Sequence, residues 1–134
     1  MKVIVEADGG SRGNPGPAGY GAVVWSADHS TVLAERKEGI GRATNNVAEY
    51  RGLLLGLERA QALGATEVEI VNDSELVAHQ INGRYKVKHP DMQPLHAQAL
   101  AALKSFDRWS VTPVPRARNA DADALVNQAL DAQR

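Results

Sequence analysis

The chain has 134 residues, of which 43% are hydrophobic and 23% charged, with a formal net charge of −1 and no cysteine. This composition is typical of a globular domain with a single core, and it excludes disulfides, thiolate metal sites and a cysteine nucleophile. No apolar run has the length of a membrane span or of a signal-peptide core. We therefore expect residues 1–134 to form one monomeric domain that works in the cytoplasm.

Three strands are predicted in the first part of the chain. The first, Lys2 to Ala7, alternates apolar and polar residues and is expected to stop at Asp8-Gly9-Gly10. Residues 19–26 and Thr31 to Glu38 are rich in strand-forming residues, and the turn residues 27–30 join them. This spacing predicts an antiparallel meander.

The rest of the chain alternates helices and strands. Thr44-Asn45-Asn46 supplies capping residues for a long amphipathic helix that ends near Leu63-Gly64. A buried strand at residues 67–71 precedes a helix that stops at Asn82-Gly83, and a helix (95–104), a strand (109–114) and a last helix (121–131) follow. The order β-β-β-α-β-α-α-β-α predicts an α/β fold with a mixed sheet flanked by helices.

Four carboxylates stand at element boundaries: Asp8, Glu49, Asp73 and Asp123. Each has an ordinary structural explanation. Asp8 could start a turn, Glu49 could complete a capping box with Asn46, Asp73 could cap a helix, and Asp123 could complement a helix dipole. Their positions in the predicted topology nevertheless indicate a site, because Asp8 and Asp73 follow strands expected to be neighbours while Glu49 and Asp123 open helices packed on them.

Carboxylates gathered in this way repel one another unless cations compensate their charge. Ligands that are all oxygen favour Mg²⁺ or Mn²⁺ over zinc. Two such ions would clamp the attacking and leaving oxygens of a phosphodiester, a reaction that needs no protein nucleophile. The sequence therefore predicts a metal-dependent phosphodiester hydrolase.

Four ordered motifs resemble those of the type 1 ribonuclease H family, and the match covers essentially the whole chain. The motifs are residues 8–21 (Asp-Gly-Gly-Ser-Arg-Gly-Asn-Pro-Gly-Pro-Ala-Gly-Tyr-Gly), residues 44–49 (Thr-Asn-Asn-Val-Ala-Glu), Asn72-Asp73-Ser74, and Val114-Pro115-Arg116 with Asn119 and Ala122-Asp123. A glycine-rich loop alone is weak evidence, but the ordered combination is specific.

The resemblance implies a ribonuclease H-like fold with five strands, three antiparallel and then parallel, and an endonuclease that cuts the RNA strand of RNA/DNA hybrids. The products would carry 5′-phosphate and 3′-hydroxyl ends. By the family pattern two Mg²⁺ ions, for which Mn²⁺ may substitute, are held by the four carboxylates. Asp8 would bridge both ions, Glu49 and Asp73 would join it on one, and Asp123 on the other; the Asn119 to Asp123 spacing favours Asp123 over Asp121.

The resemblance also implies residues that read the hybrid. Side-chain amides can contact the 2′-hydroxyls that distinguish RNA, and Thr44 with Asn14 matches a pocket for a DNA-strand phosphate. Lys86 and Lys88 belong to a basic cluster suited to phosphates, and Arg116 and Arg118 stand where many relatives carry a loop histidine. The predicted substrate-binding residues are Asn14, Thr44, Asn45, Asn46, Lys86, Lys88, Arg116 and Arg118. Helix capping is the alternative for Thr44, Asn45 and Asn46, and plain solvent exposure is the alternative for the cations.

One branch of the family carries a basic helix-loop insertion, for which residues 86–93 are too short, so the chain is most similar to the compact archaeal-type branch. Two alternatives stay open on the residues alone. The chain could be another nuclease of the ribonuclease H-like superfamily, such as a transposase or integrase core, or a catalytically silent module that binds hybrids. A fused downstream domain in a longer natural protein is also compatible with the sequence.

Overall fold

The structure, a computed structural model, describes residues 1–132. Five strands form one sheet in the order β3-β2-β1-β4-β5. The elements in chain order are β1 (Lys2–Ser11), β2 (Gly16–Ser26), β3 (Val32–Ala43), α1 (Asn45–Ala62), β4 (Glu67–Asn72), α2 (Glu75–Ile81), α3 (Gln93–Leu103), β5 (Arg108–Pro113), the 3₁₀ helix η1 (Arg116–Asn119) and α4 (Ala120–Ala132).

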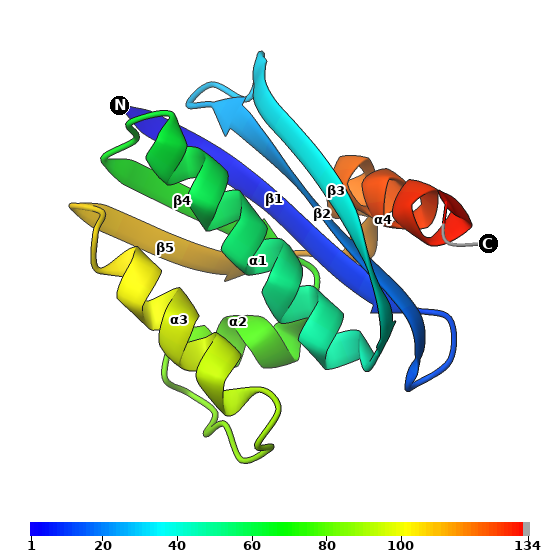
Figure 1. Cartoon of the computed structure of the whole chain (residues 1–134). Coiled ribbons are helices and arrows are strands. Elements are labelled where there is room, and N and C mark those ends of the chain that lie inside the picture. The colour runs from blue at the N-terminus through cyan, green and yellow to red at the C-terminus, as the bar shows by residue number, and fades with distance from the viewer. Residues whose placement is uncertain (133–134) are drawn as a thin grey trace.

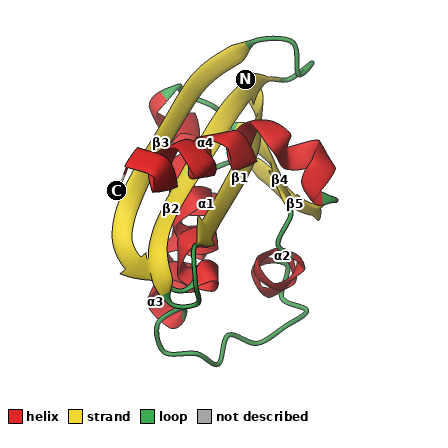
Figure 2. Ribbon diagram, turned by 90° about the vertical axis from the view of Figure 1, so that its right-hand side faces the viewer, coloured by secondary structure: helices red, strands yellow, loops and turns green. Residues whose placement is uncertain are grey.

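Pairing within the sheet confirms the predicted fold class. Strands β1, β2 and β3 are antiparallel, whereas β1–β4 and β4–β5 are parallel. Helices α1 and α3 lie over one face of the sheet and α4 crosses the other (Figures 1 and 2). Within residues 1–132 no helix combines the length and the apolar character that crossing a membrane requires.

The hydrophobic core lies between the sheet and helices α1 and α3. Val3, Val5 and Ala7 of β1 are fully buried there, and Leu53 and Leu57 of α1 pack in the same cluster. This is the alternation that the sequence of the first strand predicts. The edge strand β3 consists mostly of exposed residues, five of which are charged, a composition that discourages pairing with another chain.

The predicted end of the first strand is wrong. Strand β1 does not stop at Asp8-Gly9-Gly10 but continues to Ser11, with Gly9 opposite Tyr20 and Gly10 opposite Gly19. Glycine is required at position 9 because a Cβ there would lie 2.1 Å from the carbonyl carbon and oxygen of Ala48 in α1. The glycine that looks like a turn signal in the sequence instead allows a helix to approach the strand.

The start of α1 also differs from one interpretation of the sequence. Thr44 is the N-cap, and its hydroxyl accepts a hydrogen bond from the amide of Val47 at 3.3 Å. Glu49 is thus the fifth residue of the helix and no partner in a capping box. Similarly, Ser74 and not Asp73 caps α2, with its hydroxyl accepting from Val77 at 3.2 Å. Capping therefore does not explain either carboxylate.

The loop after α2 agrees with the sequence-based prediction, whereas the segment before α4 differs from it. The segment between α2 and α3, residues 82–92, is an irregular loop, so the basic helix-loop insertion is absent as predicted. The short 3₁₀ helix η1, which carries Arg116 and Arg118, was not predicted. Its four residues are too few to produce a readable periodicity.

The close approach of α1 to β1 generates a prediction about stability. We expect Gly9→Ala to lower the free energy of unfolding by at least about 2 kcal/mol, because the new methyl group overlaps helix backbone that cannot yield. Gly10→Ala is the matched control, since the nearest atoms to its Cβ lie 3.5 and 3.6 Å away. Urea unfolding of both variants measures the difference; equal stabilities would contradict the proposed contact.

Candidate active site

Asp8 and Asp73 meet because β1 and β4 are parallel neighbours. The register pairs Ala7 with Asn72, so the next residue of each strand's chain is one of these aspartates. Asn72 is fully buried, and its side-chain oxygen accepts a hydrogen bond from the amide of Ser74 at 2.7 Å. This bond turns the chain immediately after β4 and so fixes the position of Asp73.

Glu49 reaches Asp8 through the glycine contact between α1 and β1. A Cβ at Gly52 would lie 2.3 Å from the carbonyl oxygen of Asp8, and the one at Gly9 would lie 2.5 Å from the amide of Glu49. Glycines on both elements allow this separation. The helix backbone is therefore seated on the strand at the very residues that carry the two carboxylates.

The carboxylates of Asp8, Glu49 and Asp73 offer oxygens that all lie within 4.8 Å of one another. Asp8 and Glu49 are nearly inaccessible, with exposed fractions of 1% and 4%. Oε2 of Glu49 and Oδ2 of Asp73 are buried without a hydrogen-bond partner. Buried anionic oxygens that lack donors are costly, so these three residues are well suited to hold a cation.

Protonation also relieves the repulsion among these buried carboxylates when no cation is bound. Burial, followed by the charge of Asp73, raises the pKa of Asp8 to about 7. Burial, followed by the charges of Asp8 and Asp73, raises the pKa of Glu49 to about 10. In the metal-free fold the pair thus retains protons at neutral pH, which a bound divalent ion would displace.

Asp123 lies beside this cluster and Asp121 does not. Oδ1 of Asp123 is 4.0 Å from Nε of Arg116, which is itself 3.7 Å from Oδ2 of Asp73. Asp123 also contributes to raising the pKa of Asp8. Asp121 instead lines a hollow with Trp25 on the α4 side of the sheet. Three predicted ligands thus converge directly, and the fourth is linked to them by an arginine.

Asn119 attaches the segment that carries Arg116 and Asp123 to the sheet. Its side chain is fully buried, and its amide donates to the carbonyl oxygen of Ala7 at 2.9 Å, across 112 residues of chain. The acceptor precedes Asp8 directly. This bond therefore helps to hold η1 and the first turn of α4 next to the carboxylates.

The predicted substrate-binding residues Asn14, Thr44, Asn45 and Asn46 lie together around the N-terminus of α1. The side-chain oxygen of Asn14 accepts from the amide of Asn45 at 3.1 Å, and that of Asn45 accepts from the amide of Ser11 at 3.2 Å. Asn14, Thr44 and Asn46 line a shared hollow with His89 and Met92. Sequence reasoning did not assign His89 to this group, because the loop that carries it comes from more than 40 residues further along the chain.

The predicted cations other than Arg116 are not drawn into the carboxylate cluster. Lys86, Lys88 and Arg118 have exposed side chains, and none of them forms an ion pair within the part of the chain that the structure describes. The backbone carbonyl of Lys86 accepts from Gln80, which also accepts a hydrogen bond from the buried hydroxyl of Tyr50. These contacts tie the basic loop to α1 and α2.

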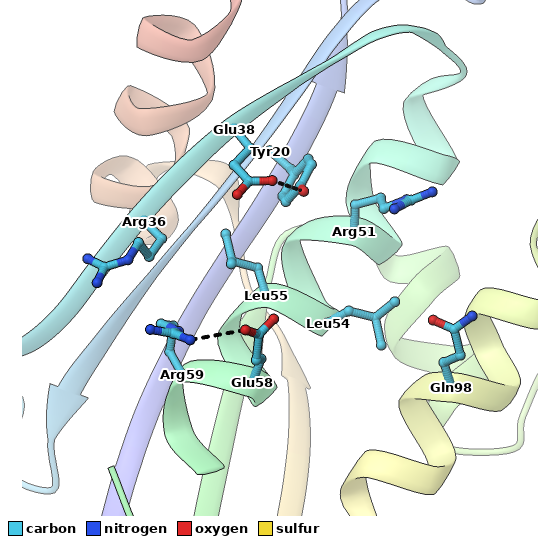
Figure 3. Close-up of a pocket in the computed structure, with 9 residues that line it drawn as sticks. All are labelled: Tyr20, Arg36, Glu38, Arg51, Leu54, Leu55, Glu58, Arg59 and Gln98. Carbon is cyan, nitrogen blue, oxygen red and sulfur yellow. Dashed lines mark hydrogen bonds and ion pairs between the residues drawn. The ribbon is translucent and has the colours of Figure 1, made fainter. Parts of the chain in front are cut away.

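A separate hollow lies over α1 between β3 and α3 (Figure 3). It contains none of the predicted site residues, and its polar groups largely satisfy one another: Tyr20 donates to Glu38 and Arg59 pairs with Glu58. Figure 3 shows the side chains of Arg36 and Arg51 extending to opposite sides of the hollow. Its charges do not converge, so the carboxylate cluster is the stronger candidate.

The chain is similar to proteins of known family along most of its length. The family model described as reverse transcriptase-like matches residues 6–129. The bifunctional protein Rv2228c of Mycobacterium tuberculosis is 66% identical over 132 residues, and the match covers 98% of this chain and 36% of that protein. Ribonuclease HI of Halobacterium salinarum is 48% identical over 124 residues, covering 92% of this chain and 62% of the relative. The chain thus spans about one to two thirds of these relatives.

Solved structures agree along nearly the whole chain. The N-terminal ribonuclease H domain of the M. tuberculosis protein superposes with a TM-score of 0.96 at 65% identity, covering 97% of this chain and 99% of that one. Ribonuclease H1 from H. salinarum gives 0.94 at 46%, covering 98% and 99%. LC11 ribonuclease H1, solved in complex with an RNA/DNA hybrid, gives 0.92 at 40%, covering 98% of both chains.

The raised pKa values generate a prediction for the protein in EDTA. Above the ordinary pKa of an aspartate, 3.8, the folded state holds protons on Asp8 and Glu49 that the unfolded state has released. Stability should therefore fall as pH rises from about 5 to about 8, on the order of 2 kcal/mol. Asp8→Asn should flatten this fall and raise the melting temperature at pH 8.

Asp107→Asn is the control, because Asp107 is exposed and remote from the cluster in chain and sheet. Its melting temperature should decline with pH as that of the wild type does. Thermal unfolding followed by circular dichroism at several pH values makes the comparison. A decline equally steep in the Asp8 and Asp107 variants would refute the electrostatic strain at the cluster.

Proposed function

The chain belongs to the type 1 ribonuclease H family, and from this premise we propose that it is an endonuclease that hydrolyses the RNA strand of RNA/DNA hybrids. The cleavage would depend on divalent metal ions and would leave 5′-phosphate and 3′-hydroxyl ends. The observation that carries the proposal is the convergence of Asp8, Glu49 and Asp73, with buried oxygens that lack hydrogen-bond partners.

We assign two Mg²⁺ ions to the site, which Mn²⁺ could replace. Asp8 would bridge them, Glu49 and Asp73 would complete one position, and Asp123 would serve the other. When bound, the ions would supply Lewis-acid chemistry, which activates water near neutral pH and stabilises the departing 3′ oxygen. The protein's own contribution is to hold four carboxylates at fixed positions, so catalysis is largely electrostatic and positional.

The asparagines are suited to recognise the RNA strand. The side-chain oxygen of Asn45 is occupied by the amide of Ser11, so its NH₂ group is left to donate to a 2′-hydroxyl. Asn46 lines the hollow beside Thr44 and Asn14 and would contact the same minor groove. Thr44 and Asn14 would hold a phosphate of the DNA strand, although both also organise the α1 N-terminus.

The exposed cations would add phosphate contacts at the margins of the site. Lys86 and Lys88 project from the loop between α2 and α3, and Arg116 and Arg118 from η1. Lys86, Lys88 and Arg118, which form no ion pair among residues 1–132, would gain most from a polyanion, because binding releases the counterions condensed on it. A monomeric state, a cytoplasmic location and a fused downstream domain, as in the longer M. tuberculosis relative, stay predictions.

Asp73→Asn tests the catalytic role. It removes the charge of a proposed metal ligand while keeping the shape of the side chain, so we expect cleavage to fall by at least about a thousandfold. Hybrid affinity should stay within about threefold of wild type, because the substrate contacts lie elsewhere. Gel assays of cleavage and fluorescence anisotropy measure the two quantities, with Asp107→Asn as the control that retains activity.

The same assay identifies the substrate class and the metal. RNA/DNA hybrid, duplex RNA, duplex DNA and single strands are incubated with Mg²⁺, with Mn²⁺ or with EDTA. We expect hybrid cleavage with either ion and none in EDTA. Cleavage in EDTA would reject the proposed reaction. Binding of the hybrid with no cleavage in either Mg²⁺ or Mn²⁺ would also reject it.

A second pair of variants separates the two aspartates of the last helix. Asp123→Asn should lower turnover by about a hundredfold or more, because it weakens the second ion position. Asp121→Asn should retain wild-type turnover, since Asp121 lies on the α4 side of the sheet beside Trp25. Steady-state kinetics with RNA/DNA hybrid measures both turnover numbers. If Asp121→Asn loses turnover and Asp123→Asn retains it, Asp121 and not Asp123 is the fourth metal ligand.

A further inference from the structure

Arg116 occupies an unusual position between two carboxylates. Its Nε lies 3.7 Å from Oδ2 of Asp73 and 4.0 Å from Oδ1 of Asp123. Among residues 1–132 it is the one cation paired with either of them. A single guanidinium therefore faces two side chains that, by the proposed function, bind divalent ions.

The two ends of this contact differ in burial. The side chain of Asp73 is 8% exposed and its Oδ2 has no hydrogen-bond donor, whereas the side chain of Arg116 is 78% exposed. Both distances exceed the 2.7–2.9 Å that is typical of a charge-assisted hydrogen bond. The arginine is thus held mainly by charge, and it can leave at little cost.

We propose that Arg116 is a built-in counter-ion that takes the place of a divalent cation between Asp73 and Asp123 in the metal-free protein and moves away when an ion binds there. The inference rests on the proposed metal site. It assigns Arg116 a positioning role that is distinct from contact with substrate: the arginine keeps the two carboxylates together before the ion arrives. Since arginine does not lose its proton at ordinary pH, only displacement can vacate the position.

The backbone around Arg116 is suited to this displacement. Asn119 at the end of η1 is buried and bonded to Ala7, and the amide of Arg118 donates to the carbonyl of Pro115 at 2.9 Å. The short helix therefore stays in place while the exposed side chain rotates. Ion binding and release would need no movement of the chain itself.

The proposal predicts competition between Arg116 and the metal. A unit charge about 4 Å from the ligands opposes a cation even in water, so its removal should tighten Mg²⁺ binding by about fivefold. Without metal, the same removal should lower the melting temperature by about 2 °C, because the two carboxylates lose their shared cation. A residue that only supports the fold would lower stability without strengthening metal binding.

The experiment compares Arg116→Gln with Arg118→Gln. Both variants remove one positive charge from the same 3₁₀ helix, but Arg118 forms no ion pair among the described residues. Thermal unfolding of the whole chain is recorded in EDTA and over a series of MgCl₂ concentrations. We expect the Mg²⁺ concentration that raises the melting temperature above its EDTA value by a fixed increment to be about fivefold lower in Arg116→Gln alone, and the melting temperature of this variant in EDTA to be lower.

Three results would overturn the inference in distinguishable ways. If the melting temperatures of wild type and both variants rise with Mg²⁺ concentration in the same way, the metal site stands but Arg116 does not compete for it. If Mg²⁺ leaves the melting temperature of wild type unchanged over the whole series, the proposed metal site fails as well. Weaker Mg²⁺ binding by Arg116→Gln would likewise reject the counter-ion and show that Arg116 supports the ion.

Discussion

The close seat of helix α1 on strand β1 is the contact on which the rest of the molecule depends. Gly9 and Gly52 remove the side chains that would keep the two backbones apart. Ala7, two residues before Gly9, pairs with Asn72 of the neighbouring strand β4. The carbonyl of Ala7 also accepts the hydrogen bond of Asn119. Helix, strand and C-terminal segment are thus all positioned against three consecutive residues of one strand, residues 7–9.

The electrostatic character of the site follows from that arrangement. Elements packed this closely exclude water from Asp8 and Glu49, so the free energy of keeping both charged rises and their pKa values rise with it. Asp73 adds to the repulsion instead of relieving it. The fold thereby stores an unfavourable interaction that protons or Arg116 relieve in part, and that divalent ions would relieve more completely.

The residues proposed to recognise the hybrid and the carboxylate proposed to act in its cleavage are separated by only a few residues in α1. Thr44 and Asn45 organise the helix start through local hydrogen bonds, and Glu49 follows one turn later among the carboxylates. Because one rigid helix carries both groups, a hybrid read by the asparagines would be presented to the carboxylates at a constant offset. His89 joins the amide side of this arrangement from the loop between α2 and α3.

The sequence by itself determined the features that depend on neighbouring residues. Alternation in Val3, Val5 and Ala7 predicted a buried strand, Thr44 was recognisable as a cap, and turn residues marked the meander. A local signal misled at Gly9-Gly10, which is typical of a strand end although β1 runs through it. The capping alternative for Glu49 is also local, and the structure does not support it because Thr44 is the cap. Both assign a local role to a residue whose partner lies far away in the chain.

Only the tertiary structure decided which side chains meet. It separates Asp123 from Asp121 and sets Arg116 between Asp73 and Asp123. It also makes His89 line the same hollow as Asn14 and Thr44. The four predicted carboxylates span 116 residues, counted from Asp8 to Asp123. Sequence patterns report which face of an element is apolar, whereas the distance between such side chains depends on how closely two backbones can approach, here through a pair of glycines.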